Sequence, residues 1–93
     1  MQLPRSAYIV LSQLARDGPL CPVDISERAR LAPRTVSYAL RRLTSTRLCK
    51  KIPNLIDMRR PLYTPNLEVA REVVQRFGPD SLIGSQLTLL LRR

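Results

Sequence analysis

The chain has 93 residues, of which 44% are hydrophobic, a composition typical of one small folded domain with a thin core. No apolar run approaches the roughly 20 residues that a membrane-spanning helix needs. The first five residues also lack the basic and then apolar layout of a signal peptide. We therefore expect an intracellular, cytoplasmic protein that does not bind membranes.

The positive charge of the chain is concentrated in one segment. The formal net charge is +9, from 16 Lys and Arg residues against 7 Asp and Glu residues. Between Arg28 and Arg60 ten residues are basic and only Asp57 is acidic, whereas the six basic and six acidic residues elsewhere cancel. Such a local excess is typical of a protein that binds a polyanion.

Metal, cofactor and catalytic chemistry find little support in the sequence. The chain has no histidine and two cysteines, Cys21 and Cys49, so a four-ligand zinc site lacks ligands. Neither cysteine has a histidine partner for nucleophilic catalysis, and no glycine-rich phosphate loop is present. We expect no enzymatic activity, no cofactor and no metal. Free buried thiols are the expected state of the cysteines, and a disulfide between them is the alternative.

Hydrophobic spacing and Gly/Pro breaks divide the chain into short elements. Ser6 is the expected N-cap of the first helix, Gly18-Pro19 its end, and Pro22 the first residue of the second helix. The elements expected in chain order are a helix over about 7–17, a bridge of strand at 20–21, helices over 22–30 and 33–46, a strand over 48–52, a loop over 53–60, a return strand over 62–64, a helix over 67–77 and a C-terminal apolar helix over 82–91.

The helix expected from Pro33 has two contrasting faces. The residues at the spacing of a buried stripe are Val36, Ala39, Leu40 and Leu43. The residues on or beside the opposite face are Arg34, Thr35, Ser37, Tyr38, Arg41, Arg42 and Ser45, and none of them is acidic. Arginine recognises guanine edges and grips phosphates, so this face suits a DNA major groove. An ordinary solvated amphipathic helix is the alternative interpretation.

A hairpin with a charged tip follows this helix directly. Its loop ends in Asp57-Met58-Arg59-Arg60. Because proline has no amide hydrogen to donate, Pro61 must lie either on an edge strand or at the first position of the return strand. A hairpin in this place is a wing, which in DNA-binding proteins contacts the duplex beside the recognition helix.

This order of elements resembles the winged helix-turn-helix family of transcription regulators, of the MarR type or a compact archaeal or viral relative. The segments that carry the resemblance are 24–31 (DISERARL), 34–43 (RTVSYALRRL), Leu48 and 57–64 (DMRRPLYT). The resemblance implies a mainly helical α+β fold with a small β-hairpin, as one domain over 1–93. Arg30 departs from the pattern, because such turns often carry Gly there. The chain is also shorter than typical MarR proteins, so the resemblance does not decide whether this chain senses a small molecule.

The resemblance further implies a sequence-specific, nucleoid-associated regulator that binds double-stranded DNA, with the 33–46 helix in the major groove and the 53–60 loop on the backbone or in the minor groove. The residues expected to contact DNA are Arg34, Thr35, Ser37, Tyr38, Arg41, Arg42, Lys50, Lys51, Arg59 and Arg60. Arg59 is expected to enter a minor groove or grip a phosphate, with Asp57 orienting it. Lys50, Lys51 and Arg60 are better suited to phosphates than to bases.

The C-terminal segment is too apolar to lie free in water, so it either folds back on the first helix or pairs with a second copy. Regulators of this architecture usually bind near-palindromic sites as two-fold dimers. We therefore expect a homodimer formed by the first helix and residues 80–93. The alternative function is a winged helix that contacts protein or RNA within a larger complex.

Overall fold

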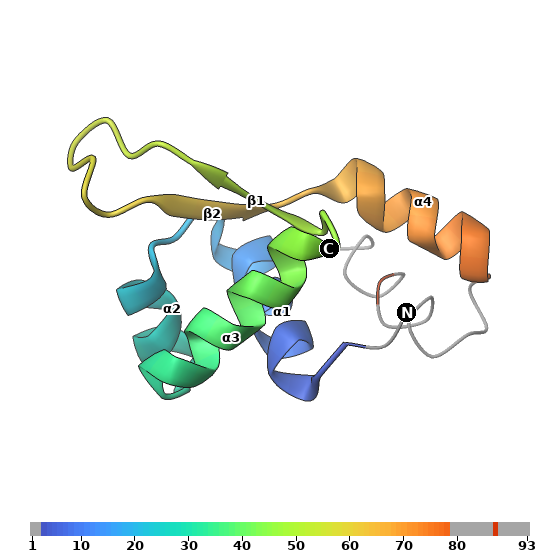
Figure 1. Ribbon diagram of the computed structural model, residues 1–93, viewed down its shortest axis with the longest axis horizontal. Helices are drawn as coiled ribbons and strands as arrows, with labels where there is room; N and C mark the ends of the chain where they lie inside the picture. The colour runs from blue at the N-terminus through green and yellow to red at the C-terminus, as the bar shows by residue number, and fades with distance from the viewer. Residues whose placement is uncertain (1–2, 79–86, 88–93) are drawn as a thin grey trace.

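The computed structural model describes residues 3–78 and Leu87 (Figure 1). Its elements are α1 (Arg5–Asp17), α2 (Pro22–Ala29), α3 (Pro33–Ser45), β1 (Cys49–Ile52), β2 (Leu62–Pro65) and α4 (Leu67–Phe77). This mainly helical architecture with one two-stranded antiparallel sheet confirms the predicted fold class. No helix in the described part of the chain has the length and apolar character needed to cross a membrane.

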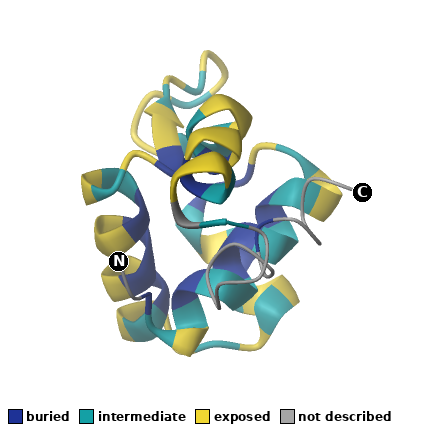
Figure 2. Cartoon of the chain, turned by 90° about the vertical axis from the view of Figure 1, so that its right-hand side faces the viewer, coloured by how far each residue is buried: buried dark blue, intermediate teal, exposed yellow. Residues whose placement is uncertain are grey.

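Helices α1, α2 and α3 pack against one another and enclose the core. Each contributes a completely buried aliphatic side chain, namely Leu14 from α1, Ile25 from α2 and Leu43 from α3. Figure 2 shows buried residues on the inward sides of the helices and exposed residues on their outer sides. Because complete burial of such a side chain contributes about 1.5–3 kcal/mol, these contacts fix which face of α3 points outward.

The turn between α2 and α3 contains an arginine in a conformation that Gly favours. Arg30 has φ 56° and ψ 45°, which costs a non-glycine residue roughly 1–2 kcal/mol. Two hydrogen bonds stabilise the turn: the Leu31 amide donates to the Ser26 carbonyl at 3.1 Å, and the Ser26 hydroxyl donates to the Leu31 carbonyl at 2.6 Å. The turn therefore keeps the backbone conformation that Gly would give, although Arg occupies the position.

The sheet joins the hairpin to the helical body. In β1 and β2, Cys49 pairs with Pro65 and Ile52 pairs with Leu62. On the other side of β2, Leu20 forms a single antiparallel bridge to Tyr63 through hydrogen bonds of 2.8 and 3.1 Å. This bridge confirms the short strand expected at 20–21, and it ties the base of the hairpin to the segment between α1 and α2.

Two predicted details of the helix ends are wrong. The N-cap of α1 is Pro4, and Ser6 lies inside the first turn, because the Ala7 amide already donates to the Pro4 carbonyl at 2.9 Å. The spacing of Leu67 with Ala70, Val73, Val74 and Phe77 predicts one apolar face of α4, but Leu67, as the first residue of that helix, is exposed. The sequence also offers Thr64-Pro65-Asn66 as capping residues for α4, and the Asn66 side chain does accept a hydrogen bond from the Val69 amide.

The apolar C-terminal segment is described at one residue. Leu87 is completely buried in the same core cluster as the helices. The remainder of the helix expected over 82–91 lies outside the described residues.

Candidate nucleic-acid interface

The outward face of α3 is the main candidate surface. The predicted contact residues of this helix that are exposed are Arg34, Ser37, Tyr38, Arg41 and Arg42, and Thr35 is half-buried. Among the described residues neither Arg34 nor Arg41 forms an ion pair, so both guanidinium groups are available to a ligand. The first turn of α3 contains no acidic residue, and the partial positive charge of the helix N-terminus adds to that of Arg34.

At the C-terminal end of α3, side-chain hydroxyl groups donate hydrogen bonds to backbone carbonyls of the same helix. Thr44 donates to the Leu40 carbonyl at 2.8 Å, and Ser45 and Thr46 each donate to the Arg42 carbonyl at 3.0 Å. The hydroxyl of Ser45, which the sequence placed on the polar face, therefore bonds within its own helix, and Thr46 is the C-cap. The side chains that remain for a partner lie toward the N-terminal and central turns of α3.

One arginine of the basic segment is already paired with a carboxylate. Arg28 of α2 forms an ion pair of 3.1 Å with Asp17 at the end of α1. Hydrogen bonds from Arg28 and, secondarily, from Gln13 lower the pKa of Asp17. Arg28 thus links two helices of the body, which fits a structural role better than a role in ligand binding.

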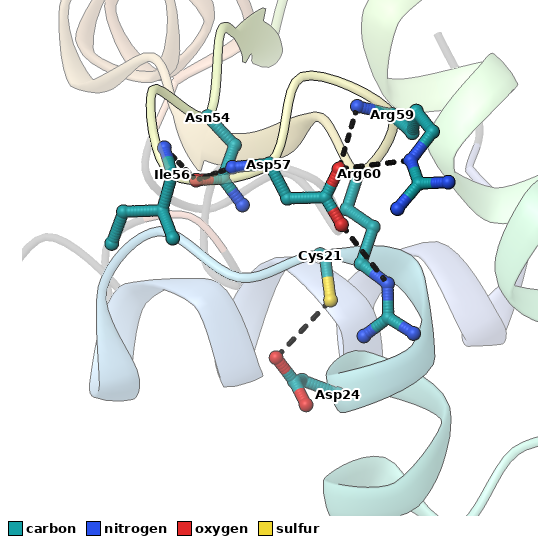
Figure 3. Close-up of polar contacts among 7 residues, drawn as sticks. All are labelled: Cys21, Asp24, Asn54, Ile56, Asp57, Arg59 and Arg60. Carbon is teal, nitrogen blue, oxygen red and sulfur yellow. Dashed lines mark hydrogen bonds and ion pairs between the residues drawn. The ribbon is translucent and has the colours of Figure 1, made fainter.

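The wing, defined as residues 53–60, projects from the helical body as an arm (Figure 1). Asp57 organises its second half. One carboxylate oxygen, Oδ1, accepts hydrogen bonds from the Arg59 amide at 3.1 Å and from Arg59 Nε at 3.3 Å. The other oxygen, Oδ2, lies 3.8 Å from Arg60 Nε (Figure 3). The predicted contact between Asp57 and Arg59 is confirmed, and Arg60 joins it.

The first half of the wing is fixed by Asn54. Its side-chain oxygen accepts hydrogen bonds from the backbone amides of Ile56 at 3.1 Å and Asp57 at 3.3 Å (Figure 3). Short polar side chains commonly stabilise turns in this way. Asn54 and Asp57 together hold the loop and direct the two arginines, although each surface ion pair contributes only about 0–1 kcal/mol to stability.

A third basic group lies at the base of the hairpin. Lys50 and Lys51 are exposed on β1, and with Arg47 they line a shallow hollow whose other walls are Thr44, Cys49, Tyr63 and Asn66. Arg47 was not among the predicted contact residues. Its position in the basic segment could have suggested a contact with a polyanion. Its left-handed backbone conformation, with φ 65°, is visible only in the structure.

The two cysteines are buried and free, so the alternative of a disulfide is not what the structure shows. Burial raises the pKa of the Cys49 thiol to about 11. Cys21 donates its thiol hydrogen to Asp24 Oδ2, with a sulfur-to-oxygen distance of 3.1 Å. The described residues contain no group of three His, Cys, Asp or Glu side chains that could hold a metal ion.

Comparison with protein families gives a match. Residues 8–48 match the family model described as winged helix-turn-helix DNA-binding. The wing and the exposed basic face of α3 fit the fold that this description names, and the matched residues span α2, α3 and most of α1. Comparison with curated proteins gives no match.

Several solved structures have a similar fold, and one of them is a MarR-family transcription regulator. A structure of ZitR from Lactococcus lactis is 24% identical, with a TM-score of 0.68 over 81% of this chain and 53% of that chain. BpsR from Bordetella bronchiseptica is also 24% identical, with a TM-score of 0.70 over 95% of this chain and 60% of that one. A MarR-family transcription regulator with 10% identity has a TM-score of 0.73. The chain therefore spans about half the length of the structures that it matches.

The arrangement around Asp57 gives a prediction in which charge and geometry have opposite effects. Asp57→Ala makes the chain more positive by one unit, which alone would strengthen binding to DNA. We expect binding to be about 3-fold to 10-fold weaker, because Arg59 and Arg60 lose the carboxylate that positions them. The measurement is a fluorescence-anisotropy titration with duplex DNA.

The matched control is Glu72→Ala, which makes the same charge change on an exposed position of α4. This variant should bind DNA as the parent chain does or slightly more tightly. If Asp57→Ala binds as tightly as Glu72→Ala, then Asp57 does not position the wing arginines for DNA.

Proposed function

We propose that this chain is a sequence-specific transcriptional regulator that binds double-stranded DNA at the nucleoid through α3 and the wing. The observation that carries the proposal is the acid-free, outward face of α3, held in place by the buried stripe behind it. The family description of residues 8–48 supports DNA as the polyanion, and transcription regulators share the fold.

In this proposal α3 lies in the major groove. Arg34 and Arg41 are assigned to guanine edges or phosphates, because a guanidinium group can donate two hydrogen bonds to guanine O6 and N7. Ser37 supplies a hydroxyl between them, and Tyr38, which is 46% exposed, offers both a ring and a hydroxyl. Thr35 and Arg42 are assigned to the adjacent sugar-phosphate backbone.

The wing and β1 supply contacts to the backbone and the minor groove, without hydrogen bonds to base edges in the major groove. Arg59 and Arg60 are assigned to the backbone or to the minor groove, where arginine responds to groove width. Lys50 and Lys51 are assigned to phosphates, and Arg47 joins them because it lines the same hollow. The helix would thus read bases directly, while the wing and the lysines would mainly add affinity through the backbone and the minor groove.

Counterion release tests the proposal quantitatively. If the protein neutralises about six phosphates, the logarithm of the binding constant should fall with the logarithm of salt concentration at a slope of about −5. Arg41→Ala should relax base preference at one or two positions, whereas Lys50→Ala should weaken binding to all sequences alike. The measurement is a salt series of binding titrations on duplexes with single base-pair changes.

Duplex RNA is the control ligand, because its deep, narrow major groove does not admit a recognition helix. A flat salt dependence, or equal affinity for duplex RNA, would contradict the DNA assignment. Equal effects of Arg41→Ala and Lys50→Ala on all sequences would show that the outward face of α3 does not read bases.

We also propose a homodimer that uses α1 and residues 80–93. On α1, Tyr8 and Ile9 are only partly buried, and they line an open groove with other residues of the helix and Leu3. Leu87 packs into the core of its own chain, so the pairing would involve the rest of the segment. A two-fold dimer would place two α3 helices in major grooves about 34 Å apart.

Sedimentation equilibrium tests the dimer. The full chain should have twice the mass of one chain, and a chain truncated after Gly78 should have the mass of one. Because truncation also removes the buried Leu87, Leu90→Glu in the full chain is the second variant, and circular dichroism checks that each protein is folded. A truncated chain and a Leu90→Glu chain that both remain dimeric would contradict the proposed interface.

A further inference from the structure

The tip of the wing exposes three large apolar side chains within four consecutive residues. The exposed fraction is 87% for Leu55, 98% for Ile56 and 69% for Met58, the highest values among the large hydrophobic residues that the structure describes. A single exposed hydrophobic residue is ordinary, but three on one protruding loop form a contact surface that no other described part of the chain covers.

The backbone of the tip is held in one shape by polar side chains. Asn54 accepts hydrogen bonds from the Ile56 and Asp57 amides, and Asp57 accepts one from the Arg59 amide. The Arg60 amide also donates to the Asp57 carbonyl at 3.0 Å, which closes a turn around Met58. The apolar side chains therefore sit on a preorganised loop, and this lowers the entropy cost of placing them in a binding partner.

The charges beside the tip indicate the chemistry of that partner. Arg59 and Arg60 immediately follow Met58, and the one acid of the loop, Asp57, already faces both guanidinium groups. An apolar tip flanked by cations complements the minor groove of DNA, because phosphates line its rims and base steps can be opened by an apolar wedge. Leu, Ile and Met are among the residues that other proteins insert in this way.

We propose that Ile56, supported by Leu55 and Met58, inserts into the minor groove and bends the duplex, while Arg59 and Arg60 hold the flanking phosphates. The inference rests on the proposed DNA-binding function and adds to it a deformation of the DNA. Since pyrimidine–purine steps are the easiest to unstack, a TA or CA step beneath the wing should favour binding although no side chain hydrogen-bonds to it.

A lipid surface and a second protein chain are the other occupants that an apolar tip could have. DNA is favoured because the wing lies in the same basic segment as the acid-free face of α3, whose serine, threonine and tyrosine hydroxyls suit base edges and phosphates. Insertion into a membrane would leave that helix face without a role.

The test uses the full chain with Leu55→Ser, Ile56→Ser and Met58→Ser combined, and duplexes labelled at both ends for energy transfer. The parent chain should shorten the end-to-end distance of the duplex. The triple variant should bind roughly 10-fold more weakly or worse and leave the duplex straighter. Its salt slope should match that of the parent chain, because no phosphate contact is lost, whereas Arg59→Ala should reduce the slope by about one.

Val23→Ser is the matched control, because Val23 is 53% exposed on α2 and outside the wing, and it should behave as the parent chain. Thermal melting checks that the variants are folded. If the parent chain binds DNA but the triple variant binds and bends it equally well, the wedge is overturned and the proposed function stands. If the parent chain does not bind DNA, the proposed function fails and the wedge with it.

Two further experiments test whether a membrane or a second copy of the chain binds the tip instead. Any electrostatic binding to vesicles containing phosphatidylserine should be equal for the parent chain and the triple variant, and sedimentation should give the same mass for both. Vesicle binding that the triple variant loses, or a loss of self-association in that variant, would overturn the wedge in favour of a membrane or a second copy.

Discussion

The burial of the apolar stripe of α3 against α1 is the constraint on which the remaining arrangement depends. Val36, Ala39 and Leu43 are completely buried, so rotation of α3 about its axis would expose them and bring arginines into the core. The same packing fixes the polar face outward. Because the loop after α3 leads directly into β1, it also fixes where the hairpin leaves the body. The DNA sequence specificity proposed for the outer face of α3 therefore depends on the packing of its inner face.

Electrostatics then divide the basic segment into parts with different tasks. Arg28 is paired with Asp17 and holds two helices together. Arg34 and Arg41 form no ion pair within the described residues, which suits direct contact with a ligand. Asp57 gathers the two wing arginines at the tip. The net charge of +9 alone would not reveal this division, because it treats a structural cation and a ligand-binding cation alike.

Most of the fold follows from periodicity and from Gly and Pro positions, which predicted each helix and strand that the structure describes between residues 3 and 78. What the sequence left open depends on bonds between side chains and backbone. The bracing of the wing by Asn54 and the left-handed conformations of Arg30 and Arg47 have no signature in hydrophobic spacing. The exposure of Leu55 and Ile56 also went unpredicted, since apolar residues in a loop are equally compatible with burial under it. The contact residues themselves came from charge, from the helical face and from the resemblance to winged helix-turn-helix regulators, and their roles on DNA are still predictions.

The most direct measurement of the central claim is dimethyl sulfate protection on a selected duplex, because the reagent methylates guanine N7 in the major groove and adenine N3 in the minor groove. We predict protection of guanine N7 where α3 lies, together with protection or enhanced reactivity of adenine N3 at the adjacent site of the wing. Unchanged reactivity at guanine N7 in a saturated complex would contradict this prediction, because α3 would then not occupy the major groove.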